Sequence, residues 1–574
     1  MKQRIETLIQ TALLHIDPAF STSITLERPR DLTHGDWSSS IAMVLAKRMQ
    51  RPPRALAEQI VGHIPADNTI SSITIAGPGF INFTLSQSYF NQQLDTMWAS
   101  PSCGVDPIAT TKTVVVDYSS PNLAKEMHVG HLRSTIIGDA IANILAFQGF
   151  RVIRQNHIGD WGTQFGMLLA HMQTEQQNTQ NFALTDIESF YQAAKKRFDT
   201  DPNFADQARA WVVKLQAHET ESLALWQRFI GLSLAHCQAI YQRLGVGLTL
   251  ADVRAESAYN DVLALMIETL ARQNLLTVQD GTKCVFLDEF KGKDQLPLPI
   301  IVQKKDGGYL YATTDLAALQ YRHTVLHAKR ILYVVDARQS LHFQQIFALA
   351  VKAGFVDAHT ELEHVEFGMI LDKAGRPFKS RDGGVTKLSE LLDEAEQRAN
   401  LLIASKNPQM DPKERQIMAT VIGMAAVKYA DLSKNRMSDY MFDWDTMLSF
   451  EGNTAPYLLY ANTRIHSLFL KAGKAMTDLT HPFQLESSPA ITLAKHLVQF
   501  PDCISTIVLK ATPHLLCTYL YELAGLFSSF YEACPILTAD NPTTQQNRLK
   551  LAGLTSRVLE QGLSLLGIKT LKHM

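Results

Sequence analysis

The sequence has no apolar run long enough to cross a membrane and no apolar segment close behind its first residues. It begins Met-Lys-Gln-Arg-Ile-Glu, whereas a transmembrane helix needs ~18 consecutive apolar residues and a secretory signal needs a continuous apolar core. We therefore expect a protein that is neither exported nor held in a membrane, and hence a cytoplasmic location.

Cysteine is scarce as well, with six residues among 574 and no Cys-x-x-Cys pair. This spacing argues against a disulfide framework and against a zinc ribbon, because both need paired or closely spaced cysteines. We expect a reducing compartment, no protein-bound zinc and no other resident metal.

The sequence also has no large excess of positive or negative side chains. The chain carries 54 Lys+Arg and 56 Asp+Glu, a formal net charge of −2. Any surface for nucleic acid must therefore be a local basic patch rather than a property of the whole chain. The composition, 46% hydrophobic and 19% charged, is that of a globular protein. Because 574 residues exceed what one hydrophobic core fills, several domains are expected.

The most informative segment is a His-Val-Gly-His (HVGH) turn at residues 128–131. The β-branched residues 113–116 predict a buried parallel strand before it, and apolar residues at helical spacing predict a helix that begins near His131. The free N–H groups of that helix can hold a phosphate, and Gly130 lets the anion reach the backbone. His128 and His131 can then stabilise negative charge on the phosphate. Two histidines three residues apart could instead share a metal, but no cysteine stands nearby to complete such a site.

A second polar turn follows the next β-like stretch. Residues 152–153 are β-branched and lead into a glycine-rich segment that contains Gly159 and Asp160. Since ligands of open α/β sheets bind at the carboxyl ends of the strands, we expect this turn to face the same ligand. Residues 170 to about 300 then carry long Gln-, Ala- and Glu-rich stretches, which predict a helical insertion between two halves of the nucleotide fold.

Tyr311 and Asp315 stand four residues apart, which places them on one face of a helix. A buried carboxylate beside an aromatic ring suits a guanidinium, which needs a bidentate partner and a stacking surface. The pattern alone is more typical of a helix-capping Asp and a core Tyr.

The two ends of the chain differ in character. Residues 1 to about 105 predict a small α+β unit, with helices near 5–14 and 41–57 and strands near 73–75 and 77–85. An exposed Phe80 and Asn82 on that sheet could stack on an unpaired base and hydrogen-bond to it, although a core Phe and a turn Asn would give the same pattern. From about residue 390 the chain is expected to be helical to its end.

Together these segments resemble the arginyl-tRNA synthetases, a family of class I aminoacyl-tRNA synthetases. Residues 119–139 are similar to the family's ATP-binding signature, and residues 428–436, 450–460 and 562–569 are similar to its anticodon-binding domain. The resemblance implies an α/β Rossmann-like catalytic domain of the HIGH-type nucleotidyl transferases at 106–390, with the helical insertion at about 170–300. It also implies a small α+β N-terminal domain at 1–105 that contacts tRNA, and an all-α C-terminal domain at 391–574 that binds the anticodon.

The resemblance also implies an activity and its ligands. It predicts ATP, as its Mg²⁺ complex, and L-arginine as substrates, arginyl-adenylate as the intermediate, tRNA(Arg) as the acceptor, and a monomeric enzyme. The residues it implies are His128, Gly130, His131, Gly159, Asp160, Lys125, Lys379 and Arg381 for ATP and catalysis, Asp117, Ser120, Asn122, Tyr311, Asp315 and Gln339 for arginine, and Phe80 and Asn82 for tRNA.

The second ATP loop departs from the usual pattern of two lysines. In the basic, glycine-flanked stretch at 375–384, cations can close over the leaving pyrophosphate. Lys379 is present, whereas Arg381 or the more distant Lys387 must replace the second lysine, and Lys125 beside the HVGH turn can compensate. Without the resemblance, this stretch would be interpreted as a solvated turn.

Two other interpretations remain open from the sequence. One is another HxGH nucleotidyltransferase that makes a small-molecule adenylate, and the flanking domains and the 562–569 tail count against it. The other is a catalytically silent tRNA-binding paralogue, which the intact HVGH turn, Tyr311 and Asp315 disfavour.

Overall fold

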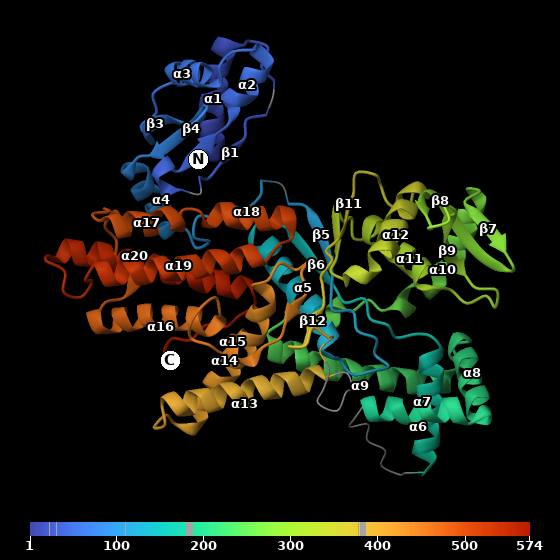
Figure 1. The fold of residues 1–574 in the computed structure, drawn as a ribbon. Helices are drawn as coiled ribbons and strands as arrows, with labels where there is room; N and C mark the ends of the chain where they lie inside the picture. Colours follow the sequence, from blue (N-terminus) through green and yellow to red (C-terminus); the bar gives the residue numbers. More distant parts are fainter. Residues whose placement is uncertain (22, 30, 110, 179–186, 377, 379–385) are drawn as a thin grey trace. The chain divides into compact units, whose positions relative to one another are not determined.

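The computed structural model describes residues 1–574 except 22, 30, 110, 179–186, 377 and 379–385 (Figure 1). The chain divides into two compact units. One comprises residues 1–104, 467–501 and 525–558, and the other comprises 105–466, 502–524 and 559–574. The carboxy-terminal helices therefore supply residues to both units.

The first unit contains a four-stranded antiparallel sheet of order β1-β2-β4-β3. Helices α2 and α3 contact this sheet, and α1 packs on α3. The helix expected over 41–57 is divided in two, because Gln50 adopts a left-handed conformation with φ 52° and Pro53 begins the next helix. The bounds are α1 Lys2–Ile16, β1 Leu26–Glu27, β2 Trp37–Ser39, α2 Ile41–Met49, α3 Pro53–His63, β3 Ile70–Ala76 and β4 Phe80–Leu85.

Helix α4 (Gln87–Ala99) joins the carboxy-terminal residues of the same unit. The Lys550 ammonium lies 3.0 Å from a carboxylate oxygen of Asp95, and Arg557 donates a hydrogen bond of 2.7 Å to the carbonyl of Trp98. Helix α20 (Pro542–Leu565) is therefore bonded to α4 through these side chains. Helix α17 (Ser488–Leu497) packs against α4 as well.

The second unit is built on a four-stranded parallel sheet of order β11-β10-β5-β6. Val114, Val115 and Val116 of β5 are buried, which confirms the predicted buried parallel strand. The bounds are β5 Thr113–Asp117, α5 Val129–Phe147, β6 Arg151–Gln155, α11 Tyr311–Thr324, β10 Arg330–Tyr333, α12 Ser340–Lys352 and β11 Glu361–His364.

The segment expected to be helical to about residue 300 is helical only in its first part. Its helices are α6 Thr163–Asn178, α7 Ile187–Thr200, α8 Pro202–Gln216, α9 Thr220–Leu244 and α10 Asn260–Arg272. An antiparallel sheet then follows, with β7 Leu276–Gln279, β8 Thr282–Lys291 and β9 Pro297–Gln303. The prediction is wrong here because it rests on the composition of the whole stretch, whereas the local pair Asp280-Gly281, with φ 49° and 82°, forms a two-residue hairpin turn.

The remaining chain is largely helical, as expected. One short exception is the parallel pair of β12 (Ile370–Leu371) and β13 (Tyr440–Met441). No helix within the described residues is long and apolar enough to cross a membrane. The helices are α13 Leu388–Lys406, α14 Pro412–Leu432, α15 Trp444–Met447, α16 Ala455–Ala472, α18 Phe500–Lys510 and α19 His514–Ala533, and the 3₁₀ turns are η1 Leu32–His34, η2 Leu250–Asp252, η3 Glu256–Tyr259, η4 Ala337–Gln339 and η5 Met476–Asp478.

Helix α5 forms the centre of the second unit, because most of its residues are buried on every side. A buried ion pair joins it to α14, with the Arg133 Nε and a carboxylate oxygen of Asp431 3.1 Å apart. Arg133 also donates a 3.1 Å hydrogen bond to the carbonyl of Ser438. On another side of α5, a Cβ added to Gly138 would lie 2.2 Å from the Cβ of Tyr118.

We expect the substitution Gly138→Ala to lower the free energy of unfolding by about 1–3 kcal/mol, because the added methyl overpacks the contact with Tyr118. Gly231→Ala is the matched control, since a Cβ at Gly231 in α9 meets nothing within 4 Å. The control should raise helix stability by about 0.5–1 kcal/mol. Thermal and urea unfolding of both variants measure the difference. Equal stability of Gly138→Ala and the unaltered protein would contradict this packing.

Candidate active site

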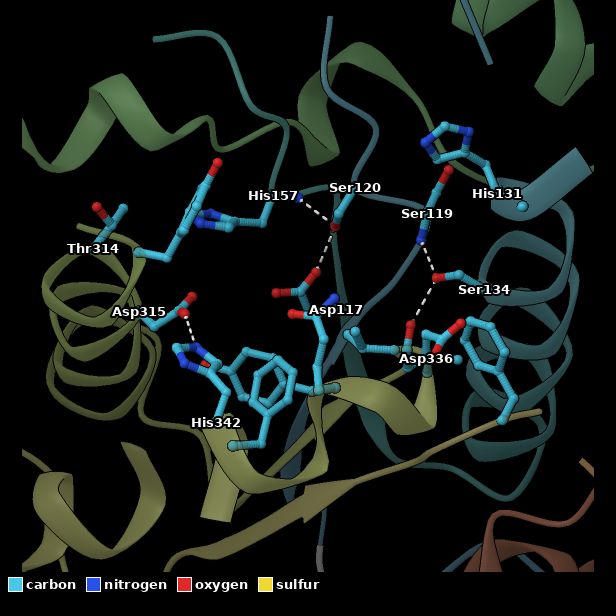
Figure 2. A pocket seen from close by; sticks show the side chains of 18 of the residues that line it. Asp117, Ser119, Ser120, His131, Ser134, His157, Thr314, Asp315, Asp336 and His342 are labelled. Atoms are coloured by element: carbon cyan, nitrogen blue, oxygen red, sulfur yellow. Dashed lines mark hydrogen bonds and ion pairs between the residues drawn. The ribbon is translucent and has the colours of Figure 1, made fainter. Parts of the chain in front are cut away.

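A cavity of about 370 Å³ lies at the carboxyl ends of β5 and β10 (Figure 2). This is the edge of a parallel sheet at which α/β proteins bind ligands. Its walls come from the loop after β5, the start of α5, the first turn of α11 and the segment after β10. The lining residues are Asp117, Ser119, Ser120, Gly130, His131, Ser134, His157, Glu256, Tyr311, Thr314, Asp315, Tyr333, Val334, Val335, Asp336, Gln339, His342, Phe343 and Phe367.

The loop after β5 holds its polar groups in a strained backbone. Ser119 and Ser120 have φ values of 70° and 45°, which residues with a Cβ rarely adopt. The Ser119 N–H donates to the Ser134 hydroxyl at 2.8 Å, and the Ser120 hydroxyl donates to Asp117 at 2.8 Å. These bonds are drawn in Figure 2 and fix the Ser120 hydroxyl beside the Asp117 carboxylate.

The HVGH turn caps α5 with its own histidines. The helix begins at Val129, two residues before the predicted start, because the His128 Nδ1 accepts the Gly130 N–H at 3.0 Å. The His128 backbone N–H in turn donates to Nδ1 of His131 at 3.1 Å. Since Nδ1 is the acceptor in each ring, the proton of each neutral imidazole is on Nε2.

Both imidazoles are neutral at physiological pH. Burial and then the neighbouring His128 lower the pKa of His131 to about 3, although part of the ring still reaches the cleft. Burial and then Lys125 lower the pKa of His128 as well. The two rings can therefore offer Nε2–H hydrogen bonds to an anion without carrying a charge of their own.

Gly130 is required by the cap itself. A Cβ at this position would lie 2.7 Å from Cε1 of His128 and 2.8 Å from its Nδ1. A side chain here would therefore displace the His128 ring, in addition to hindering the approach of an anion to the backbone.

Two acidic side chains, for which the described residues supply no lysine or arginine partner, face the cleft. Asp315, one turn after the start of α11, accepts a 2.7 Å hydrogen bond from Nε2 of His342. Glu256 lies in η3, and burial, followed by repulsion from Asp160 and Asp315, raises its pKa to about 8. Tyr311, at the start of α11, leaves 69% of its surface exposed beside them. An uncompensated acidic wall next to an exposed aromatic ring suits a cationic, planar ligand.

Asp117, by contrast, already has a cationic partner. The fully buried Arg322 donates to it at 2.6 Å and to Gln155 at 2.6 Å, and its guanidinium lies 4.7 Å from the centre of the Tyr333 ring. The charge of Asp117 is therefore compensated inside the protein. Its role toward a ligand is that of a hydrogen-bond acceptor fixed in place, rather than a free counter-charge.

The structure brings together only part of the set implied by the resemblance. Residues Asp117, Ser120, Gly130, His131, Tyr311, Asp315 and Gln339 line the cavity. Residues His128, Asn122, Gly159, Asp160 and Lys125 are outside this lining, and Lys379 and Arg381 are outside the described residues.

Several residues outside the lining have structural contacts. Asn122 accepts the Ala124 N–H at 3.0 Å and forms a backbone bridge with Gly159. Asp160 accepts the Ser257 N–H at 3.0 Å and its hydroxyl at 2.5 Å, and burial raises its pKa. These residues support the loops that carry Ser120 and Glu256.

Glu256 is one of the lining residues that the sequence analysis missed, together with His157 and His342. It lies in a 3₁₀ turn between α9 and α10, where neither periodicity nor a motif marks it. No group of three or more His, Cys, Asp or Glu residues in the described part of the chain could hold a metal ion.

The prediction that Phe80 and Asn82 are both exposed on the N-terminal sheet is correct for only one of them. Phe80 is 40% exposed, whereas Asn82 is buried at 3%. Asn82 lies in the middle of the inner strand β4, between Ser38 of β2 and Thr74 of β3, whereas Phe80 is at the end of the strand. Phe80 is therefore the one of the two that can stack on an incoming base.

Three family models match successive parts of the chain. They are the tRNA synthetases class I (R) catalytic domain over residues 103–444, the DALR anticodon binding domain over 458–574, and the arginyl tRNA synthetase N terminal domain over 3–85.

Curated relatives and solved structures agree with these models. The arginine–tRNA ligases of Idiomarina loihiensis and Azotobacter vinelandii are 54% and 55% identical to the chain, each over the whole length of both proteins. The arginyl-tRNA synthetase structure from Plasmodium falciparum is 31% identical, with a TM-score of 0.86 over 100% of this chain and 99% of that one. The Thermus thermophilus enzyme, 24% identical over the whole of both chains, shares the fold with a TM-score of 0.82. The α/β catalytic core, N-terminal domain and helical C-terminal domain are thus those of a class I synthetase, and the chain belongs to the arginyl-tRNA synthetase family.

Proposed function

We propose that this chain activates L-arginine with ATP and transfers it to the 3′ end of tRNA(Arg). In the first step a carboxylate oxygen of arginine attacks the α-phosphorus, and the bond to pyrophosphate breaks. In the second step the terminal hydroxyl of the tRNA attacks the arginyl carbonyl, and AMP leaves. The observation that carries this proposal is the cleft itself, which has Glu256 and Asp315 on one wall and the HVGH turn on another.

The acidic wall would hold the substrate guanidinium. Asp315 and Glu256 supply negative charge, and Tyr311 supplies an aromatic surface. Gln339, Ser120 and the fixed Asp117 carboxylate are then placed to hydrogen-bond the rest of the amino acid, including its α-amino group. Asn122 supports this group through its loop, since it does not line the cleft.

The HVGH turn would act on ATP. The neutral imidazoles of His128 and His131 offer Nε2–H donors to the phosphate oxygens, and Gly130 keeps the backbone accessible. The mechanism is positioning and charge stabilisation without a covalent enzyme intermediate. Mg²⁺ arrives with ATP as part of the substrate. Lys125, Lys379 and Arg381 remain proposed partners of the phosphates, and Gly159 and Asp160 shape the same edge of the sheet.

We propose a role for each of the three expected domains. We place tRNA contacts in residues 1–105, where Phe80 is exposed and Asn82 braces the sheet, and in the helices of 391–574, with catalysis in 106–390. The free cysteines found in the described chain fit a cytoplasmic enzyme, and we propose that it works as a monomer.

Pyrophosphate exchange tests the function directly. Exchange of labelled pyrophosphate into ATP is measured with each of the standard amino acids in turn, with and without tRNA. We expect exchange with arginine alone, because lysine lacks the planar fork that Asp315 and Glu256 would grip. Exchange with another amino acid, or with none under either condition, would contradict the proposal.

We expect Asp315→Asn to weaken arginine binding by ~2 to 5 kcal/mol, because it removes a counter-charge from a desolvated guanidinium. The KM for arginine and the Kd measured by calorimetry report the loss, while the KM for ATP should change little. Asp306→Asn is the matched control, since Asp306 accepts a hydrogen bond from Gly308 shortly before α11 and does not line the cleft. An unchanged arginine affinity in Asp315→Asn would remove this residue from the site.

Arginine affinity should rise with pH up to the pKa of Glu256. In the free protein this pKa is about 8, so below that value a proton must leave before the carboxylate can pair with a guanidinium. The affinity should therefore increase up to about tenfold per pH unit from about pH 6 to 8 and level off above that range. Calorimetry in two buffers with different ionisation enthalpies should detect proton release on binding at neutral pH. Glu256→Gln should flatten the profile, and a flat profile in the unaltered protein would contradict the assignment.

A further inference from the structure

The HVGH turn has a second structural support on the side of α13. Residues 386–388 run antiparallel to it, with the Val129 N–H donating to the Thr386 carbonyl at 3.1 Å and the Leu388 N–H donating to the Met127 carbonyl at 2.9 Å. His128 and Lys387 stand opposite each other in this bridge. The start of α13 is thereby attached to the backbone of the catalytic turn.

An ion pair lies at the side of this bridge. The Lys387 ammonium is 3.3 Å from a carboxylate oxygen of Glu126, and the two side chains are only 27% and 15% exposed. Glu126 precedes His128 by two residues, and Lys387 directly precedes α13. The pair therefore joins the same two segments as the backbone bonds, with side chains that can be changed without altering the backbone.

The neighbouring cations are engaged elsewhere. Lys125 and Arg243 line the cavity of about 160 Å³ that Glu126 also borders. The Lys125 ammonium lies 4.7 Å from the centre of the Tyr191 ring. Arg243 is 2.8 Å from Asp393 and 3.0 Å from Glu396. Among these three described cations, Lys387 is the one that pairs with Glu126.

The position of the turn determines where both imidazoles point. The His128 backbone N–H is bonded to the His131 ring, and the His128 ring is bonded to the Gly130 N–H. A shift of residues 126–128 would therefore move both Nε2–H groups together. Since transition-state stabilisation depends on donors held within tenths of an ångström, such a shift lowers the rate more than it changes substrate binding.

We propose that Glu126 and Lys387 are positioning residues for adenylate formation, and that their ion pair holds the HVGH turn against the start of α13. The inference rests on the proposed activation of arginine. It assigns Lys387 a role through Glu126, in place of the direct contact with ATP phosphates that is expected of a lysine replacing the second one of the usual loop.

A double-mutant cycle separates these two roles. The variants are Glu126→Gln, Lys387→Gln and the double substitution, and the measurements are kcat and the KM for ATP in pyrophosphate exchange, the Kd for arginine, and the melting temperature. Each single variant should lose about threefold to tenfold in kcat/KM for ATP, and the double variant should lose no more than either single one. The arginine Kd and the melting temperature should stay unchanged, and Lys387→Arg should retain activity.

Glu394→Gln is the matched control, because this carboxylate pairs with Arg398 further along α13 and should leave exchange unaffected. If Lys387→Gln costs as much in the Glu126→Gln background as in the unaltered protein, the lysine acts independently of Glu126 and the proposal fails. It also fails if the single variants have full activity, or if arginine affinity and melting temperature fall together with the rate. Absence of arginine-dependent exchange in the unaltered protein would instead overturn the proposed function.

Discussion

The buried pair of Arg322 and Asp117 is the constraint on which the site depends. Arg322 comes from α11, and it binds the end of β5 through Asp117 and the end of β6 through Gln155 while packing on Tyr333 of β10. One guanidinium therefore joins three strand ends and the helix that carries Tyr311 and Asp315. A buried pair of this kind contributes little net stability, but removing one partner leaves an uncompensated charge. The pair therefore fixes the relative positions of the three strand ends and α11 more than it adds to the free energy of unfolding.

The same pair determines which carboxylates remain for a ligand. Because the protein supplies the partner of Asp117, the negative charge left in the cleft is that of Asp315, and Glu256 adds to it only when its carboxyl group loses its proton. The HVGH turn instead presents hydrogen-bond donors, because its imidazoles are neutral and carry their protons on Nε2. In Figure 2 Asp315 and His131 lie on opposite sides of the cleft. A ligand with a cation at one end and a reacting carboxylate at the other would be oriented by this contrast alone.

Local patterns were sufficient to predict the elements that carry the site. The strand before the HVGH turn, the helix after it, and the shared helical face of Tyr311 and Asp315 each follow from a few adjacent residues. Glu256 could not be found in this way, because its raised pKa arises first from burial and then from Asp160 and Asp315, and these depend on segments distant in sequence. The engagement of Asp117 by Arg322 is equally non-local, since the two residues are 205 positions apart in the sequence.

The buried pair of Arg133 and Asp431 limits how this chain can be divided. Arg133 is on the helix that follows the HVGH turn, and Asp431 is beyond the expected catalytic boundary near residue 390. A catalytic fragment cut at that boundary would keep a buried guanidinium and lose its carboxylate, at a cost of ~3–5 kcal/mol. The first helices of the carboxy-terminal region therefore belong to the folding unit of the catalytic core, and a self-standing fragment or a domain exchange must include α14.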